Sequence, residues 1–118
     1  MPQSIPKAAV LLEAAVKYLE TELMPTLEGY HRFQTRVTVN VLNTVRRELE
    51  LRGAQAEAER SRLAAILGHE GDVETLSIEL AERIRAGAIA IDDPALRAHV
   101  RQSLADALAI NNPKWLTR

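Results

Sequence analysis

The sequence contains no cysteine, and its only aromatic residues are one tryptophan, two tyrosines and one phenylalanine. The lack of cysteine excludes disulfide bonds, iron–sulfur clusters, thiolate zinc sites and cysteine nucleophiles. An excess of one charge sign is also missing, because 15 lysines and arginines oppose 16 aspartates and glutamates. Non-specific nucleic-acid binders depend on such an excess of positive charge. We therefore expect no nucleic-acid partner.

Long hydrophobic runs are also absent. The longest uncharged apolar stretch, residues 86–91, is far shorter than the roughly 20 residues that a membrane-spanning helix needs. The first residues contain two prolines and lack the basic and apolar regions of a secretory signal. We expect a cytoplasmic protein that does not bind or cross a membrane.

The residues that are present predict a folded helical protein. Hydrophobic residues make up 47% of the chain and charged residues 26%, which is typical of globular domains. Alanine and leucine, both strong helix formers, are the most frequent residues. A chain of 118 residues fits one domain. The prediction is an all-α, single-domain bundle of about five helices over residues 1–118.

Turn and capping residues define the ends of the five expected helices. Ser4 caps the first, with Pro6 in its opening turn, and the pair Met24-Pro25 ends it. The second runs from near Leu27 or Tyr30 to Leu51 and is expected to stop at Gly53. The remaining three cover residues 55–67, 72–86 and 93–110, with Gly68, Gly87 and Asn111-Asn112-Pro113 as stops and Asp72 and Asp93 as N-caps.

The segment Arg36–Val41 is ambiguous, because its β-branched residues alternate with a period of two, as in a strand. No turn residue separates it from the helical pattern that follows, so we predict helix there.

Apolar residues at helical spacing predict the buried faces. The expected buried positions are Leu12, Val16, Leu19 and Leu23; Ala56, Leu63 and Leu67; Val73, Leu76, Leu80 and Ile84; and Leu96, Val100, Leu104 and Leu108. The C-terminal tail, residues 111–118, contains Trp115 and Leu116 and is expected to pack back on the bundle.

No pattern in the sequence is specific for a metal or cofactor. Glu28 and His31 have the Glu-x-x-His spacing of di-iron bundles, but neither of the other histidines has a glutamate three residues before it. Asp92 and Asp93 supply too few oxygen ligands for calcium, and Asp93 fits an N-cap. We therefore expect neither a metal nor a cofactor, and the sequence identifies no catalytic residue.

The candidate functional residues follow the second expected helix. Helical spacing brings five polar side chains into one stripe, beside an apolar stripe of Phe33, Val37, Val41 and Val45. The polar stripe consists of Arg32, Arg36, Asn40, Asn43 and Arg47. Asparagine is unfavourable inside a helix, so a specific role is expected.

Three interpretations of this stripe remain open. It forms a structural polar network, with its arginines paired to glutamates, or it binds a phosphate or carboxylate, or it contacts a protein partner. On energetic grounds we expect Arg36, Asn40 and Arg47 to be at least partly buried.

Three motifs resemble those of a family of small bacterial proteins of unassigned function. They are the run from Arg32-Phe33 through Arg36-Val37 and Asn40 to Arg47-Glu48-Leu49, then Ile84-Arg85-x-Gly87, and finally Asn112-Pro113-x-Trp115-Leu116. Members of that family are often encoded beside acyl-CoA dehydrogenases and aminoglycoside-phosphotransferase-like kinases. The resemblance implies an accessory protein in acyl-CoA or organic-acid catabolism, with one of these enzymes as its partner.

Two hypotheses for function follow. In the first, the chain is a non-catalytic accessory or interaction module of such an enzyme system. In the second, it is a small-molecule-binding protein or an enzyme that grips an anionic acyl or phosphorylated ligand with the polar stripe. We also expect a homodimer, with Leu11, Tyr18, Ile78 and Ile89 available for a two-fold interface.

Overall fold

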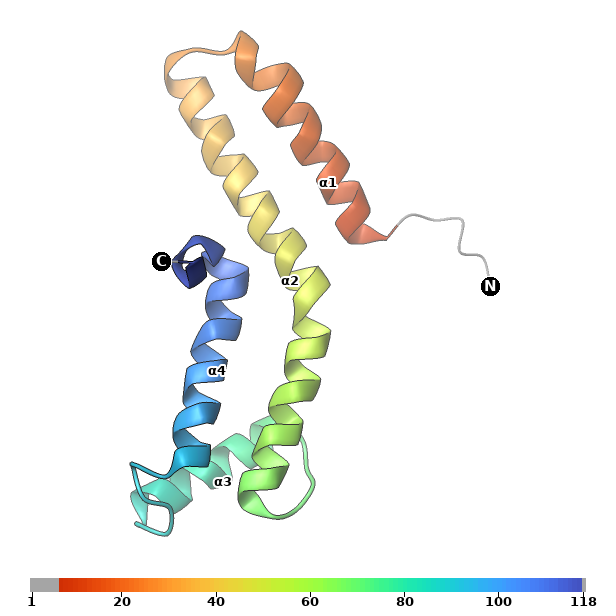
Figure 1. Cartoon of the computed structure of the whole chain (residues 1–118). Coiled ribbons are helices and arrows are strands. Elements are labelled where there is room, and N and C mark those ends of the chain that lie inside the picture. The colour runs from red at the N-terminus through yellow and green to blue at the C-terminus, as the bar shows by residue number, and fades with distance from the viewer. Residues whose placement is uncertain (1–6, 118) are drawn as a thin grey trace, which may run out of the picture. The chain divides into compact units, whose positions relative to one another are not determined.

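A computed structural model describes residues 7–117, which are helical and include no strand. The four α-helices are α1 (Ala8–Tyr18), α2 (Gly29–Leu67), α3 (Val73–Arg85) and α4 (Pro94–Asn111) (Figure 1). Shorter elements are the π-helix η1 (Leu19–Leu23) and the 3₁₀ helices η2 (Met24–Thr26) and η3 (Pro113–Thr117). The all-α prediction is confirmed. The expected cap at Ser4 lies outside the described residues.

The helix α2 joins two of the five helices that the sequence predicted, which leaves four. Gly53 was expected to end a helix, and this prediction is wrong. Positive φ angles occur at Gly29, Gly68 and Gly87 but not at Gly53, which continues the α-helix. A glycine inside a helix costs only about 1 kcal/mol relative to alanine, so its neighbours outweigh it. Residues 36–41 are helical, as predicted.

The N-terminal ends of α3 and α4 are capped by aspartates, as the sequence predicted. The Asp72 carboxylate accepts a hydrogen bond from the Thr75 backbone N–H at 2.8 Å, and this bond lowers the pKa of Asp72. Asp93 accepts from the Leu96 N–H at 3.0 Å. These caps fix the two helix starts, because they satisfy backbone donors that have no partner within the helix.

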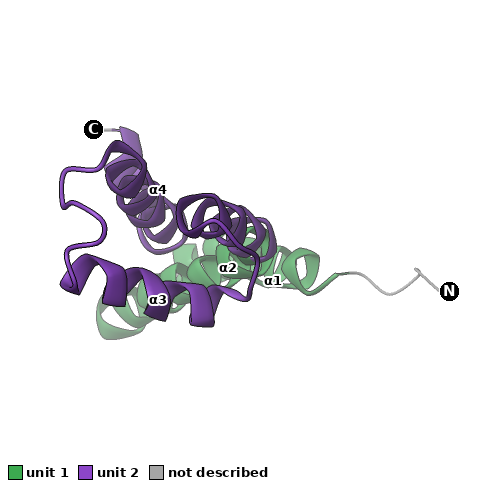
Figure 2. Cartoon of the chain, turned by 90° about the horizontal axis from the view of Figure 1, so that it is seen from below, with its two compact units in different colours: residues 1–52 green, residues 53–118 purple. Residues whose placement is uncertain are grey.

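The chain consists of two compact units, residues 1–52 and 53–118 (Figure 2). In unit 1, α1 and the first part of α2 form an antiparallel hairpin (Figure 1). Its buried apolar residues are Val16, Met24 and Val39. Leu12, Leu19 and Leu23, expected to share the buried face of α1 with Val16, are half-buried.

In unit 2, the second part of α2 packs with α3 and α4 around a core of leucines. The buried members are Leu63, Leu67, Leu76, Leu80 and Leu96, and Ile66, Val73, Ile84 and Ile89 pack against them. The expected inner face of α3 is confirmed. Ala56, expected inside, is exposed.

The buried face of α4 differs from the expected one. Leu96 is buried, but Val100 and Leu104 are 48% and 62% exposed. Their place on the inner face is taken by His99, which is buried, and by the half-buried Ser103. The cause is a polar partner on α2, Arg62, which contacts both residues. In the C-terminal tail, Trp115 and Leu116 lie in η3 and are 55% and 46% exposed.

Candidate functional sites

The polar stripe of α2 lies in unit 1, and most of its members are more exposed than expected. Arg36 is exposed and pairs with Glu20 at 3.3 Å. Asn40 is also exposed, so the expected burial of these two residues is wrong. Arg32 is exposed and donates a long hydrogen bond of 3.4 Å to the Met24 carbonyl.

The other two members of the stripe are half-buried. Arg47 donates to the Thr44 hydroxyl at 3.3 Å, and Asn43 accepts from Arg46 at 3.3 Å. The five residues therefore share a helix but do not form one polar network. Angular drift explains this result, because residues at a spacing of four move steadily around a helix of 3.6 residues per turn.

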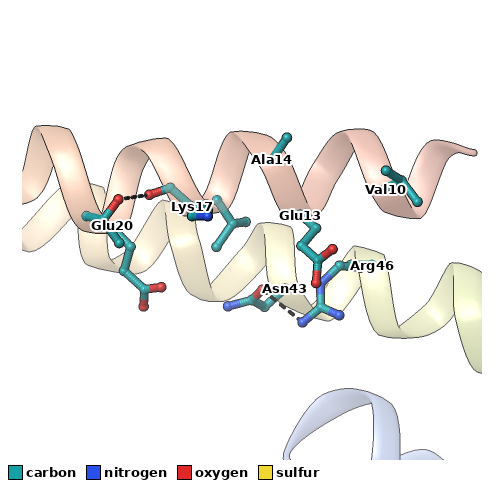
Figure 3. Close-up of a pocket in the computed structure, with 9 residues that line it drawn as sticks. Val10, Glu13, Ala14, Lys17, Glu20, Asn43 and Arg46 are labelled. Atoms are coloured by element: carbon teal, nitrogen blue, oxygen red, sulfur yellow. Dashed lines mark hydrogen bonds between the residues drawn. The ribbon is translucent and has the colours of Figure 1, made fainter. Parts of the chain in front are cut away.

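A hollow of about 690 Å³ lies between α1 and α2 in unit 1. Asn43 is the only member of the polar stripe that lines it, together with Arg46 and Lys17. Two carboxylates, Glu13 and Glu20, also line this hollow. Figure 3 shows Glu13 pointing from α1 towards Arg46. The hollow has mixed charge, which does not favour a simple anion.

Arg46 lines this hollow but does not belong to the polar stripe. It bonds Glu50 at 3.2 Å and Asn43 at 3.3 Å, while its buried Nε has no hydrogen-bond partner among the described residues. Its spacing of three from Asn43 was a signal that could have identified it.

A second hollow, of about 500 Å³, lies on unit 2, and we call it the α4 groove. Its apolar lining comes from Ile84, Ile91, Leu96, Val100 and Leu104, and its polar lining from Arg97 and Arg101. Ile91 is 81% exposed.

The two arginines of the α4 groove differ from those of the α2 stripe. Arg97 and Arg101 are one helical turn apart and exposed, and neither has an ion pair or side-chain hydrogen bond within residues 7–117. The apolar spacing of α4 does not indicate these arginines, because it predicts that Val100 and Leu104 are buried and that no groove opens beside them.

Unit 2 also contains a half-buried polar cluster between α2 and α4. Arg62 Nε donates to His99 Nδ1 at 3.1 Å, and its Nη2 lies 3.4 Å from the Ser103 hydroxyl and 3.9 Å from Asp106. Burial, and then the charge of Arg62, lowers the pKa of His99. Because His99 Nδ1 accepts a hydrogen bond from Arg62 and receives none of the help of a carboxylate at that atom, it is not arranged to activate a serine, in contrast to a Ser-His-Asp triad.

His69 belongs to an exposed cluster in the same unit. Its Nδ1 lies 3.0 Å from the Glu70 carbonyl and its Nε2 lies 2.7 Å from the Glu79 carboxylate. Both neighbours are acceptors, which the doubly protonated ring satisfies best. The backbone hydrogen bond to Glu70, followed by the Glu79 carboxylate, raises the pKa of His69.

The described residues contain neither a cluster of metal-binding side chains nor a membrane-spanning helix. Among residues 7–117, no three histidine, aspartate or glutamate side chains are grouped so that they could hold a metal ion. Within the same residues, none of the helices has both the length and the apolar character required to span a bilayer.

Comparison with known proteins gives one match. The model of a family described as a domain of unknown function, DUF6285, matches residues 25–115. No curated protein and no solved structure matches the chain. The match covers all of α2, α3 and α4, and so includes both the polar stripe and the α4 groove.

Proposed function

The chain belongs to the DUF6285 family, a domain of unknown function, and we propose that it is a non-catalytic interaction module that binds an acidic, amphipathic helix of a partner enzyme. The observation that carries this proposal is the α4 groove. The groove is lined by apolar side chains and by two arginines that have no carboxylate partner within residues 7–117, and this lining matches such a helix in both polarity and charge.

The contacts of the groove indicate how the partner would bind. Val100 and Leu104 are one turn apart on α4, and Ile91 precedes the helix, so the three present an exposed apolar surface. A partner helix covers such a surface with apolar residues at a spacing of three or four. Acidic residues beside them would then meet Arg97 and Arg101, where arginine favours bidentate pairs with carboxylates.

The resemblance to proteins encoded beside acyl-CoA dehydrogenases and phosphotransferase-like kinases suggests which enzyme carries this helix. Under this proposal, the module supports an enzyme of acyl-CoA or organic-acid catabolism in the cytoplasm. The module itself supplies binding energy and positioning rather than chemistry.

The alternative function, in which the polar stripe of α2 grips an anionic acyl or phosphorylated ligand, has less support. Arg36 is neutralised by Glu20, and the nearby hollow contains Glu13 and Glu20. An anion entering this hollow would meet two carboxylates, which oppose its binding. This function stays a prediction, and Arg46, with its buried Nε, is the residue to test for it.

The experiment uses isothermal titration calorimetry to measure binding of the purified chain to an acyl-CoA dehydrogenase and to an aminoglycoside-phosphotransferase-like kinase from the same organism, the two enzyme classes that the resemblance implies as partners. We expect binding to one of them, weakened by about tenfold or more in the double variant Arg97→Glu/Arg101→Glu, which corresponds to about 1.4 kcal/mol. The control is Lys17→Glu/Lys114→Glu, which changes the net charge equally but leaves the groove intact. Equal weakening by both double variants, or binding to neither enzyme, would contradict the proposal.

A further inference from the structure

The hollow between α1 and α2 in unit 1 contains a carboxylate and an ammonium group that have no partner within residues 7–117. They belong to Glu13 and Lys17, which both line the hollow. These residues are four apart on α1 with the glutamate first, the order that favours an ion pair on a helix. Pairs at this spacing do form elsewhere in the chain, as in Arg46–Glu50, Glu48–Arg52 and Glu79–Arg83. The two unpaired charges are therefore a local feature of the hollow.

The other charged groups of the hollow already have partners. Glu20 pairs with Arg36 at 3.3 Å, and Arg46 pairs with Glu50 at 3.2 Å. One negative and one positive charge are left without a counter-charge. A simple anion bound here would leave the glutamate unpaired, and a simple cation would leave the lysine unpaired. A ligand that carries both charges complements both residues.

The α2 side of the hollow adds two hydrogen-bond donors. Asn43 accepts a hydrogen bond from Arg46 through its Oδ1, while its amide nitrogen donates to no residue between 7 and 117. The Nε of Arg46 is buried and also lacks a partner among these residues. Buried donors in folded proteins are nearly always bonded, so this one indicates an acceptor from outside the described chain. Figure 3 shows Glu13 and Asn43 on either side of this arginine.

The rest of the lining is apolar and comes from Val10, Ala14 and Val16 on α1. Sites for small molecules combine such apolar walls with a few polar groups, in volumes of about 300–1,000 Å³. The hollow, with about 690 Å³, lies within this range. Side chains four apart on a helix have Cβ atoms about 5–6 Å apart. The two charges of the ligand must therefore be close together, as they are when one carbon atom carries both groups.

We propose that the hollow of unit 1 binds an α-amino acid with an aliphatic side chain. The ligand ammonium group pairs with Glu13, and the ligand carboxylate pairs with Lys17 and Asn43. The aliphatic side chain lies against Val10 and Ala14. This site takes a small molecule in unit 1, whereas the α4 groove in unit 2 takes part of a partner enzyme, so either proposal can fail without the other.

A titration of the ¹⁵N-labelled full chain with leucine, followed by NMR spectroscopy, tests the proposal. We expect saturable shifts of backbone amides in α1 and around Asn43, and no shifts of similar size in α3 or α4. Leucinamide lacks the carboxylate and N-acetylleucine lacks the ammonium group, so each should bind about tenfold more weakly than leucine. No saturable binding of leucine, or equal binding of either analogue, would overturn the proposal.

Two substitutions test the charges of the protein. Glu13→Gln and Lys17→Gln each change an exposed side chain, so both variants should keep the circular dichroism spectrum of the wild type. Each should weaken leucine binding by about tenfold, because one charge of the ligand loses its partner. The matched controls are Glu22→Gln and Lys114→Gln, whose exposed side chains do not line the hollow. Unchanged binding in either hollow variant, or equal weakening by the controls, would overturn the proposal.

Combining each variant with one analogue tests which end of the ligand meets which residue. N-acetylleucine has no ammonium group to lose, so Glu13→Gln should not weaken its binding further. Leucinamide has no carboxylate, so Lys17→Gln should not weaken its binding further. The opposite pattern, in which Glu13→Gln weakens N-acetylleucine and Lys17→Gln weakens leucinamide, would overturn the assignment of the two ends.

Discussion

The two units differ in how much of their apolar surface they cover by themselves. Unit 2 buries six large apolar residues, Leu63, Leu67, Leu76, Leu80, Leu96 and Ile110. Unit 1 buries Val16, Met24 and Val39, while Leu11 and Tyr18 on α1 and Phe33 and Val41 on α2 are exposed. A pair of helices has only one interface, so each helix keeps an open face. Unit 2 therefore has a hydrophobic core of its own, whereas unit 1 leaves many of its large apolar side chains exposed to solvent.

The two units also differ in their polar contacts. In unit 2, Arg62 reaches across from α2 to His99 and Ser103 on α4. In unit 1, Arg46–Glu50 and Arg52–Glu48 join residues one turn apart on the same helix, and pairs of this kind contribute only about 0.3–0.5 kcal/mol each. The ion pair that joins two elements of unit 1, Arg36–Glu20, is exposed, whereas the contacts of Arg62 in unit 2 are half-buried.

The largest expected effect comes from the core of unit 2. Leu76 is completely buried, so Leu76→Ala should lower the free energy of unfolding by about 2–5 kcal/mol, through lost burial and the cavity that remains. Ile78→Ala, on the exposed side of the same helix, should change it by less than about 0.5 kcal/mol. Urea denaturation measures both. Equal effects would contradict the placement of Leu76 in a closely packed core of unit 2.

The pKa shifts of two histidines of unit 2 predict that the stability of the chain depends on pH. The two residues contribute with opposite signs, and His99 is considered first. The pKa of His99 is lowered by burial and by Arg62, with a smaller opposing effect of Glu59, so the unfolded chain binds its proton more tightly. Its contribution to stability is complete above the ordinary pKa of 6.5 and is lost as the pH falls towards the folded value. We expect wild type to lose more stability than His99→Gln between pH 7 and pH 5.

For His69 the sign is reversed. Its pKa is raised by Glu70 and Glu79, against a smaller opposing effect of Arg83, so its contribution is complete below 6.5 and is lost as the pH rises through the folded value. His69→Gln should therefore be less stable than wild type at pH 5, and this difference should shrink at higher pH. Urea denaturation at a series of pH values measures both histidines, and parallel curves for wild type and the two variants would contradict both assignments.

The smallest expected effect concerns Gly53, the first residue of unit 2. A Cβ atom added at this position has open space around it, and its φ angle is not positive. Gly53→Ala should therefore stabilise the chain by about 0.5–1 kcal/mol, because alanine loses less backbone entropy in a helix. Thermal unfolding by circular dichroism measures the change. Destabilisation would indicate that the helix does not continue through the boundary.

Much of the fold could be predicted from local signals. Asp72 and Asp93 mark helix starts, and the inner face of α3 follows from its apolar spacing, because both features depend on residues close in sequence. Gly53 and the inner face of α4 could not be predicted in this way. His99 and Ser103 face inward because of Arg62, which lies 37 and 41 residues away in the sequence. A pattern of apolar residues alone does not include such a partner.

The candidate sites, too, could be predicted only in part. Helical spacing groups the arginines of the α2 stripe, so they could be selected as candidates from the sequence. The sequence does not show whether a glutamate neutralises them. Glu20, which pairs with Arg36, lies on another element. Arg97 and Arg101 could not be identified for the reverse reason: only the three-dimensional structure shows that no carboxylate within residues 7–117 pairs with them.

The hairpin of unit 1 has a consequence for the order in which the parts of the chain fold during synthesis. Its ion pair between Glu20 and Arg36 spans 16 residues, whereas the bonds of α4 to Arg62 and Gln55 in unit 2 span 37 and 51 residues. Closing the shorter loop costs less chain entropy, by about 1 kcal/mol. During synthesis the N-terminal part also leaves the ribosome first. We therefore expect the hairpin to form on the ribosome before the leucine core exists, with apolar side chains such as Phe33 and Val41 still exposed.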